Sequence, residues 1–210
     1  MKKVEMDKKK EGIVCSFLDK YLYTSSNGFS NEEREYSKER QLLGVDLEFD
    51  YNGRHYVCDE KAATDYIGKG LGTFVLELSS LDTTGKFLKT GWFLKEDNIN
   101  DSYLFVWLDG ARDRYLSGGS DDITECEVCL VRKEKLVGYL KRLGWDREML
   151  MEKANAIRYY GDEEFYGIYS HGYKFSYSTA DYIPEHPINI LLTREVYRSL
   201  SDFNKVIKLD

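Results

Sequence analysis

The chain has 210 residues, of which 42% are hydrophobic and 32% are charged. This composition excludes a disordered protein, and the length fits a single domain over residues 1–210 with one buried core. A net charge of -7 excludes a polybasic binder but leaves room for a local basic patch. The apolar runs are too short to cross a bilayer and the chain starts with charged residues, so we expect a cytoplasmic protein with no membrane partner.

The first part of the chain is predicted to be helical after a loose start. Residues 1–10 are mostly charged, and we expect them to be disordered. Apolar residues then recur at helical spacing over 12–24. Ser30 followed by Glu33 has the pattern of a capping box, which predicts a second helix that ends at Leu43, before a glycine.

A β-hairpin is the strongest local prediction. Residues 45–51 alternate strictly between apolar and acidic side chains, which is typical of a strand with one buried face. Asn52-Gly53 follows and is the strongest two-residue signal for a hairpin turn. Residues 54–61 are therefore expected to return as the antiparallel partner strand.

The rest of the chain mixes strands and helices. Apolar runs predict strands over 73–79, 91–94, 102–108, 125–131 and 188–192. Helical spacing and capping residues predict helices over 132–143, from Asp146 to about Tyr159, and from Thr193 to about Leu200. This order predicts an α/β protein of the mixed α+β kind, in which helices flank a central mixed sheet.

The hairpin register brings two carboxylates together. In a two-residue hairpin Tyr51 faces Arg54, and counting outward places Asp46 opposite Asp59. Lys61 projects from the same face as both. Because like charges directly opposed on a sheet repel, this pair favours a divalent cation such as Mg²⁺. The alternative is a solvated acidic face that also includes the other acidic residues of the first strand.

These residues resemble the core motif of the PD-(D/E)xK nuclease superfamily over residues 30–80. In that motif an aspartate begins the first strand, here Asp46, and the second strand carries an acidic residue, any residue and a lysine, here Asp59-Glu60-Lys61. No proline precedes Asp46, which departs from the motif. The resemblance implies a restriction-endonuclease-like core and a phosphodiesterase that uses Mg²⁺ or Mn²⁺ on DNA or RNA. Asp46 and Asp59 would bind the metal, and Lys61 would assist the attacking water.

Two further acidic positions are candidates for this site. Several members of the superfamily use a glutamate on the helix before the hairpin. The helical stripe shared with Tyr36 and Leu43 favours Glu39 for this role, with Glu35 second. A bulge in the second strand would turn Glu60 toward the site, so Glu60 is an alternative metal ligand.

A basic helix is the candidate surface for nucleic acid. Five positive charges against one glutamate over 132–142 are what a surface that follows phosphates would carry. A solvated basic face of an ordinary amphipathic helix has the same pattern. DNA is favoured over RNA as the partner, and a homodimer stays open. The basic residues are Arg132, Lys133, Lys135, Lys141 and Arg142.

The cysteines are expected to be structural. Cys126 and Cys129 have the spacing of metal ligands, but no second pair completes a zinc site. Because they are an odd number of residues apart on a predicted strand, their side chains should point to opposite faces.

Three functions fit the sequence. The first is a metal-dependent nuclease, the second a non-catalytic module on the same fold that binds nucleic acid or protein, and the third an unrelated α/β domain with an acidic surface hairpin.

Overall fold

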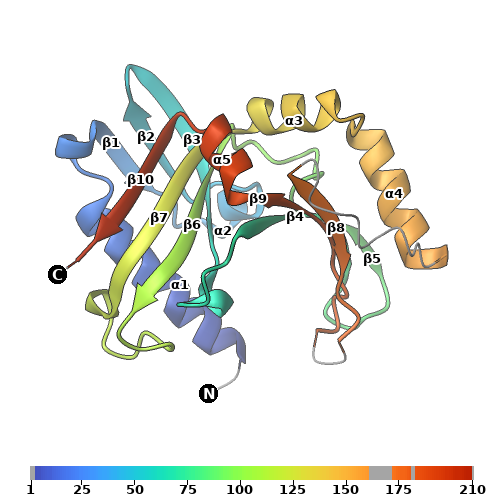
Figure 1. Ribbon diagram of the computed structural model, residues 1–210, viewed down its shortest axis with the longest axis horizontal. Helices are drawn as coiled ribbons and strands as arrows, with labels where there is room; N and C mark the ends of the chain where they lie inside the picture. The colour runs from blue at the N-terminus through green and yellow to red at the C-terminus, as the bar shows by residue number, and fades with distance from the viewer. Residues whose placement is uncertain (1–2, 161–171, 181–182, 210) are drawn as a thin grey trace. The chain divides into compact units, whose positions relative to one another are not determined.

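The computed structural model describes residues 3–160, 172–180 and 183–209 (Figure 1). Contacts divide the chain into two compact units. Unit 1 comprises Met1–Leu71, Ile99–Lys133 and Ser201–Asp210, and unit 2 comprises Gly72–Asn98 and Glu134–Leu200. Each unit contains a β-sheet and helical segments, so the predicted mixed α+β class is confirmed.

Unit 1 is built on a six-stranded mixed sheet with the strand order β1-β2-β3-β6-β7-β10 (Figure 1). The β3–β6 pair is parallel and its other neighbouring pairs are antiparallel. The parallel pair places the second strand of the hairpin inside the sheet, where residues such as Asp59 are buried. The strands are β1 (Phe29–Arg34), β2 (Leu47–Tyr51), β3 (Arg54–Ala62), β6 (Ser102–Ala111), β7 (Ile123–Arg132) and β10 (Phe203–Lys208).

Helix α1 (Lys3–Tyr21) covers one face of this sheet. Phe17 and Leu18 of α1 are fully buried and pack with the inward side chains of the strands. The helix begins at Lys3, so the predicted disorder is wrong for residues 3–10, and residues 1 and 2 lie outside the described residues. Lysine, glutamate and methionine at its start are good helix formers, and Lys10 is buried and pairs with Asp65 at 3.3 Å.

The predicted second helix is only partly present. Its first half is strand β1, which pairs antiparallel with β2, and only its second half forms the short helix α2 (Lys38–Leu42). Phe29 decides this difference because its buried ring packs on Phe49 and Tyr51. The capping residue is Ser37, whose hydroxyl accepts the N–H of Arg40, and not Ser30.

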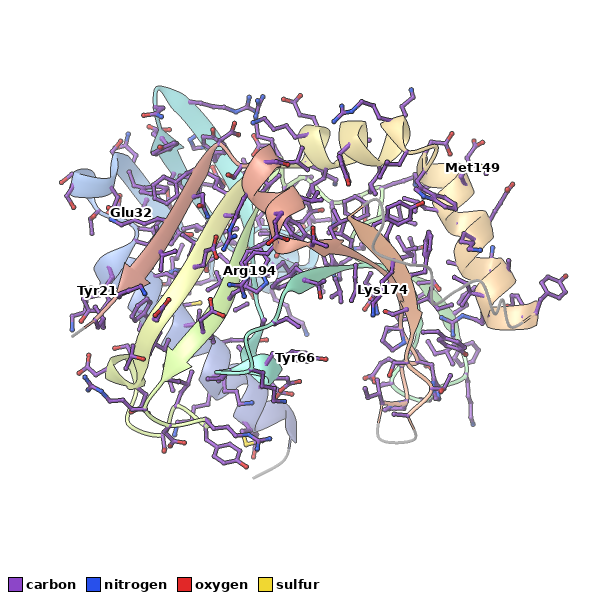
Figure 2. All side chains as sticks on the ribbon, viewed as in Figure 1. Tyr21, Glu32, Tyr66, Met149, Lys174 and Arg194 are labelled. Atoms are coloured by element: carbon purple, nitrogen blue, oxygen red, sulfur yellow. The ribbon has the colours of Figure 1, made fainter. Side chains whose placement is uncertain are left out.

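Unit 2 contains a four-stranded antiparallel sheet with the order β5-β4-β9-β8. Its strands are β4 (Thr73–Leu81), β5 (Leu88–Thr90), β8 (Tyr173–Tyr177) and β9 (Ile188–Thr193). The helices are α3 (Lys133–Arg142), which begins on the last residue of unit 1, α4 (Arg147–Tyr160) and α5 (Arg194–Leu200). Figure 2 labels Met149 on α4 and Lys174 on β8.

Most downstream predictions are confirmed, including the three helices and the strands over β4, β6, β7 and β9. The strand predicted over 91–94 is wrong, because the chain leaves β5 at Thr90 and turns there. Strands β8 and β10 were not predicted. None of the described helices is both long and apolar enough to cross a membrane.

Candidate functional site

The predicted hairpin is confirmed with its register over β2, whereas the predicted pair of Asp46 and Asp59 lies beyond the end of the β2–β3 ladder. Strands β2 and β3 pair antiparallel, with Tyr51 opposite Arg54 and Asp50 opposite His55. The turn residues Asn52 and Gly53 have φ angles of 50° and 75°, which is the left-handed backbone that this turn requires. The buried aromatic Phe49 fixes the register, because a shift by one residue would turn it out of the core.

The regular ladder ends one residue before the first candidate carboxylate. Leu47 opposite Cys58 is the last pair of the β2–β3 ladder. Asp46 stands immediately before Leu47 in the sequence, and its N–H donates to the carbonyl oxygen of Cys58 at 2.9 Å. Its carboxylate Oδ2 accepts the N–H of Glu60 at 2.8 Å. Asp46 is therefore hydrogen-bonded to the β3 backbone on both sides of Asp59, by its main chain at Cys58 and by its side chain at Glu60.

Asp59 is buried in the centre of this arrangement. Its side chain is 5% exposed, and its Oδ1 lies 2.7 Å from the Nζ of Lys61. Burial raises the pKa of Asp59 to about 7, and the nearby charge of Asp46 adds to the rise, whereas Lys61 opposes it. Without a cation, Asp59 therefore holds a proton more tightly than an ordinary aspartate does.

The side chain of Glu60 lies on the face of β3 opposite to that of Asp59 and Lys61. Its carboxylate lies 2.6 Å from Nη1 of Arg34 and accepts the hydroxyl of Tyr23 at 2.7 Å. Its side chain is 7% exposed, and α1 contributes Cys15, whose thiol points at the same carboxylate. No bulge exchanges Asp59 and Glu60, so the structure places the predicted metal ligand Glu60 in a buried ion pair away from Lys61.

The structure does not bring Glu39 to the two aspartates. Glu39 lies in the first turn of α2, and its side chain is exposed. The helical stripe that favoured it does not exist, because the segment before Ser37 is not helical. Glu35 is engaged locally, since its carboxylate accepts the N–H of Ser37 and pairs with Arg40.

The helix that supplies a nearby carboxylate is α1. The pKa of Glu11 is raised by burial and by the charges of Asp7 and Asp46, and is lowered by the charge of Lys61. Glu11 is therefore within electrostatic reach of both Asp46 and Lys61. Sequence reasoning missed it because the helical prediction began at residue 12. The glutamates at the start of α1 were the available signal.

The other acidic residues of β2 have a different environment. Glu48 and Asp50 both hydrogen-bond to the ring of His55, each at 2.9 Å, and Glu48 also pairs with Arg40. These contacts raise the pKa of His55 and lower those of both carboxyls. The charges of Glu48 and Asp50 are thus paired with basic side chains at the surface, which fits the alternative of a solvated acidic face. Asp46 and Asp59 lie farther from the hairpin turn.

The predicted basic surface is less open than the sequence indicates. The guanidinium of Arg132 donates to Asp202 at 2.8 Å. Lys133 and Lys135 are half-buried, whereas Lys141 and Arg142 are exposed at the last turn of α3. The five residues therefore do not form one exposed stripe.

Cys126 and Cys129 both lie on β7, and all four cysteines are free thiols. Cys126 is buried in the cluster that packs against α1. Cys129 lies on the other face, where the amide of Asn204 approaches its Sγ at 3.1 Å. The predicted placement on opposite faces of one strand is confirmed.

In the described part of the chain, no three histidine, cysteine, aspartate or glutamate side chains are grouped so as to hold a metal ion by themselves. A metal at Asp46 and Asp59 would need water or substrate oxygens to complete its coordination.

No family model, no curated protein and no solved structure matches this chain.

Proposed function

We propose that this chain is a metal-dependent phosphodiesterase of the PD-(D/E)xK kind that cleaves nucleic acid, with DNA as the favoured substrate. One observation supports this above the others. Asp46, directly before β2, is hydrogen-bonded to the β3 backbone on both sides of Asp59, and Lys61 lies 2.7 Å from Asp59 on the same face of β3. The position of all three follows from the hairpin register and from the backbone contacts of Asp46.

The donor set suits Mg²⁺ or Mn²⁺. Mg²⁺ is commonly bound by one or two carboxylates and keeps several water molecules, which two aspartates can satisfy. Burial raises the pKa of Asp59 to about 7, and the charge of Asp46 contributes less to the rise, so an ionised carboxylate is costly at this position. A divalent cation would remove that cost. When bound, it would lower the pKa of a coordinated water and offset the charge of the phosphate.

The residues of the chain have separate roles in this proposal. The Glu60 N–H, at 2.8 Å from Oδ2 of Asp46, holds that carboxylate in place. The ammonium of Lys61 orients the attacking water or stabilises the charge that develops on the phosphate. Glu11 interacts with the charges of Asp46 and Lys61 and is therefore the candidate for the acidic residue expected from a helix.

A second candidate is a non-catalytic module on the same fold, in a nucleic-acid or protein complex. The observation that favours it is that both aspartates already interact with other groups of the chain. Asp59 is ion-paired with Lys61, and Asp46 accepts a backbone N–H. Such contacts are also sufficient for a purely structural role.

The proposal places the protein in the cytoplasm, where free thiols such as the buried Cys58 stay reduced. It does not depend on a homodimer, because the three proposed residues come from one chain.

The test is cleavage of single- and double-stranded DNA and RNA with Mg²⁺ or Mn²⁺. We expect Lys61→Ala to bind Mn²⁺ nearly as the wild type does but to cut about a hundredfold to a thousandfold more slowly, since this is the typical loss when one charge-stabilising group is removed. Asp59→Asn should lose both Mn²⁺ binding and cleavage, because it removes a charged ligand and preserves the shape.

Two matched variants control this experiment. Asp50→Asn alters an acid on the same strand pair, and Lys69→Ala alters an exposed lysine of unit 1. Both should cut like the wild type. A wild-type protein that binds Mn²⁺ but cuts none of the four substrates would support the binding module, and cleavage that persists in all variants would identify a contaminating nuclease.

A further inference from the structure

A second lysine directly follows β7, which is separated from β3 by β6 in the sheet. In the sheet of unit 1, Asp59 is paired with Tyr103 of β6, and Tyr103 is paired with Val131 of β7. Lys133 follows two residues after Val131 and is the first residue of α3. Its N–H donates to the carbonyl oxygen of Asp101 at 2.8 Å, which fixes its backbone beside the start of β6.

The ammonium of Lys133 is within electrostatic reach of Asp59. Lys133 is half-buried, and burial lowers its pKa, whereas the charge of Asp59 raises it. Among the described residues, no side-chain hydrogen bond or ion pair occupies this ammonium. Asp59 therefore has one lysine on its own strand, in contact at 2.7 Å, and another that approaches from the beginning of α3.

The other basic residues of this segment are placed differently. Arg132 points to Asp202, with its Nε 2.8 Å from the carboxylate. Lys141 and Arg142 are exposed at the opposite end of the helix. Lys133, in contrast, lies on the sheet face of Asp59 by its register and interacts with the charge of Asp59.

We infer that Lys133 is a substrate-binding residue of the proposed phosphodiesterase, and that its ammonium contacts a non-bridging oxygen of the phosphodiester to be cleaved. This inference rests on the proposed function. If Asp46 and Asp59 bind a divalent cation, that cation balances the negative charge of Asp59, which is otherwise balanced by Lys61. The positive charges of Lys61 and Lys133 then face an anionic substrate. A lysine ammonium, with three donors on a flexible stem, is well suited to phosphate oxygens.

The experiment compares Lys133→Met and Lys133→Arg with Lys69→Ala, which alters an exposed lysine of unit 1, as the control. Lys133→Met removes the charge but keeps an apolar stem for the half-buried site. The probe is a fluorescein-labelled double-stranded DNA oligonucleotide, whose cleavage is measured with Mn²⁺ and whose binding is measured by anisotropy with Ca²⁺. Metal affinity is measured separately by titration with Mn²⁺ alone.

Lys133→Met should lower kcat/KM about a hundredfold and weaken binding of the oligonucleotide, as expected when one donor to the phosphate is lost. Its affinity for Mn²⁺ should be unchanged or higher, because a positive charge near Asp59 is removed. Lys133→Arg should restore part of the loss, and Lys69→Ala should match the wild type.

Two results would overturn this inference but leave the proposed function standing. The wild type and Lys133→Met could cut the probe equally well, or Lys133→Met could lose Mn²⁺ binding together with cleavage, which would indicate a structural role. A wild-type protein that neither binds Mn²⁺ nor cuts the probe would instead contradict the proposed function, and the inference would fail with it.

Discussion

At the scale of single residues, the site depends on one buried aspartate. Asp59 has 3% of its surface exposed, and burial raises its pKa to about 7. Because this value lies above that of an aspartate in an unfolded chain, the folded protein binds the proton more tightly. The contribution of Asp59 to stability is therefore fully present below about pH 4 and is lost as the pH rises to about 7.

This linkage predicts a pH-dependent effect of Asp59→Asn on the metal-free protein. The free energy of unfolding of the variant, relative to the wild type, should rise between about pH 4 and pH 7 and level off above, by at most about 1.4 kcal/mol for each pH unit. Urea unfolding in the presence of a chelator measures it. A difference that is constant over this range would show that Asp59 titrates normally.

At the scale of secondary-structure elements, the question is which helix supplies an acid to the site. The side chains of Glu11 on α1 and Glu39 on α2 are both exposed, and the charges of Asp46 and Lys61 act on the carboxyl of Glu11. The difference arises because residues 29–34 pair with β2 as a strand, which leaves α1 as the helix that packs on the hairpin.

A pair of isosteric variants tests this assignment. Glu11→Gln should lower Mn²⁺ affinity or Mn²⁺-dependent cleavage about 10–100-fold, which is typical for a group that acts on a metal through its surroundings. Glu39→Gln should change neither, because its carboxylate faces solvent. Equal losses in both variants, or a loss confined to Glu39→Gln, would indicate that α2 supplies the acidic residue of the site.

At the scale of the whole molecule, the fold of unit 1 carries a buried ion pair that connects three elements. Arg34 of β1 contacts Glu60 of β3 and Asp19 of α1, each at 2.6 Å, and Tyr23 donates a hydrogen bond to Glu60. The Arg34 and Glu60 side chains are only 15% and 7% exposed. Since the N–H of Glu60 also holds Asp46, this network connects the packing of α1 to the site.

Removing one member of this network should be costly. Arg34→Ala leaves the Glu60 carboxylate buried without its cation, and we expect it to lower the free energy of unfolding by about 3–5 kcal/mol. The double variant Arg34→Met with Glu60→Leu should recover much of this loss, because both charges are removed together. Urea unfolding of the three proteins measures these values, and a loss below about 1 kcal/mol in Arg34→Ala would show that water reaches the pair.

The sequence by itself determined the hairpin, its register and the side of β3 that carries Asp59 and Lys61. These follow from local chemistry, because Asn52-Gly53 fixes the turn and strict alternation fixes the faces. The helix that Asp146 caps was also determined by local sequence, since the capping hydrogen bond is made within one turn.

Only the tertiary structure decided the surroundings of the two aspartates. Whether residues 29–34 form a helix or a strand depends on contacts of Phe29 with residues about twenty positions away, which outweigh a local capping pattern. The approach of Glu11 and Lys133 likewise depends on how α1 and β7 pack around β3. The buried environment that raises the pKa of Asp59 also comes from the assembled sheet, because desolvation requires neighbours that are distant in the sequence.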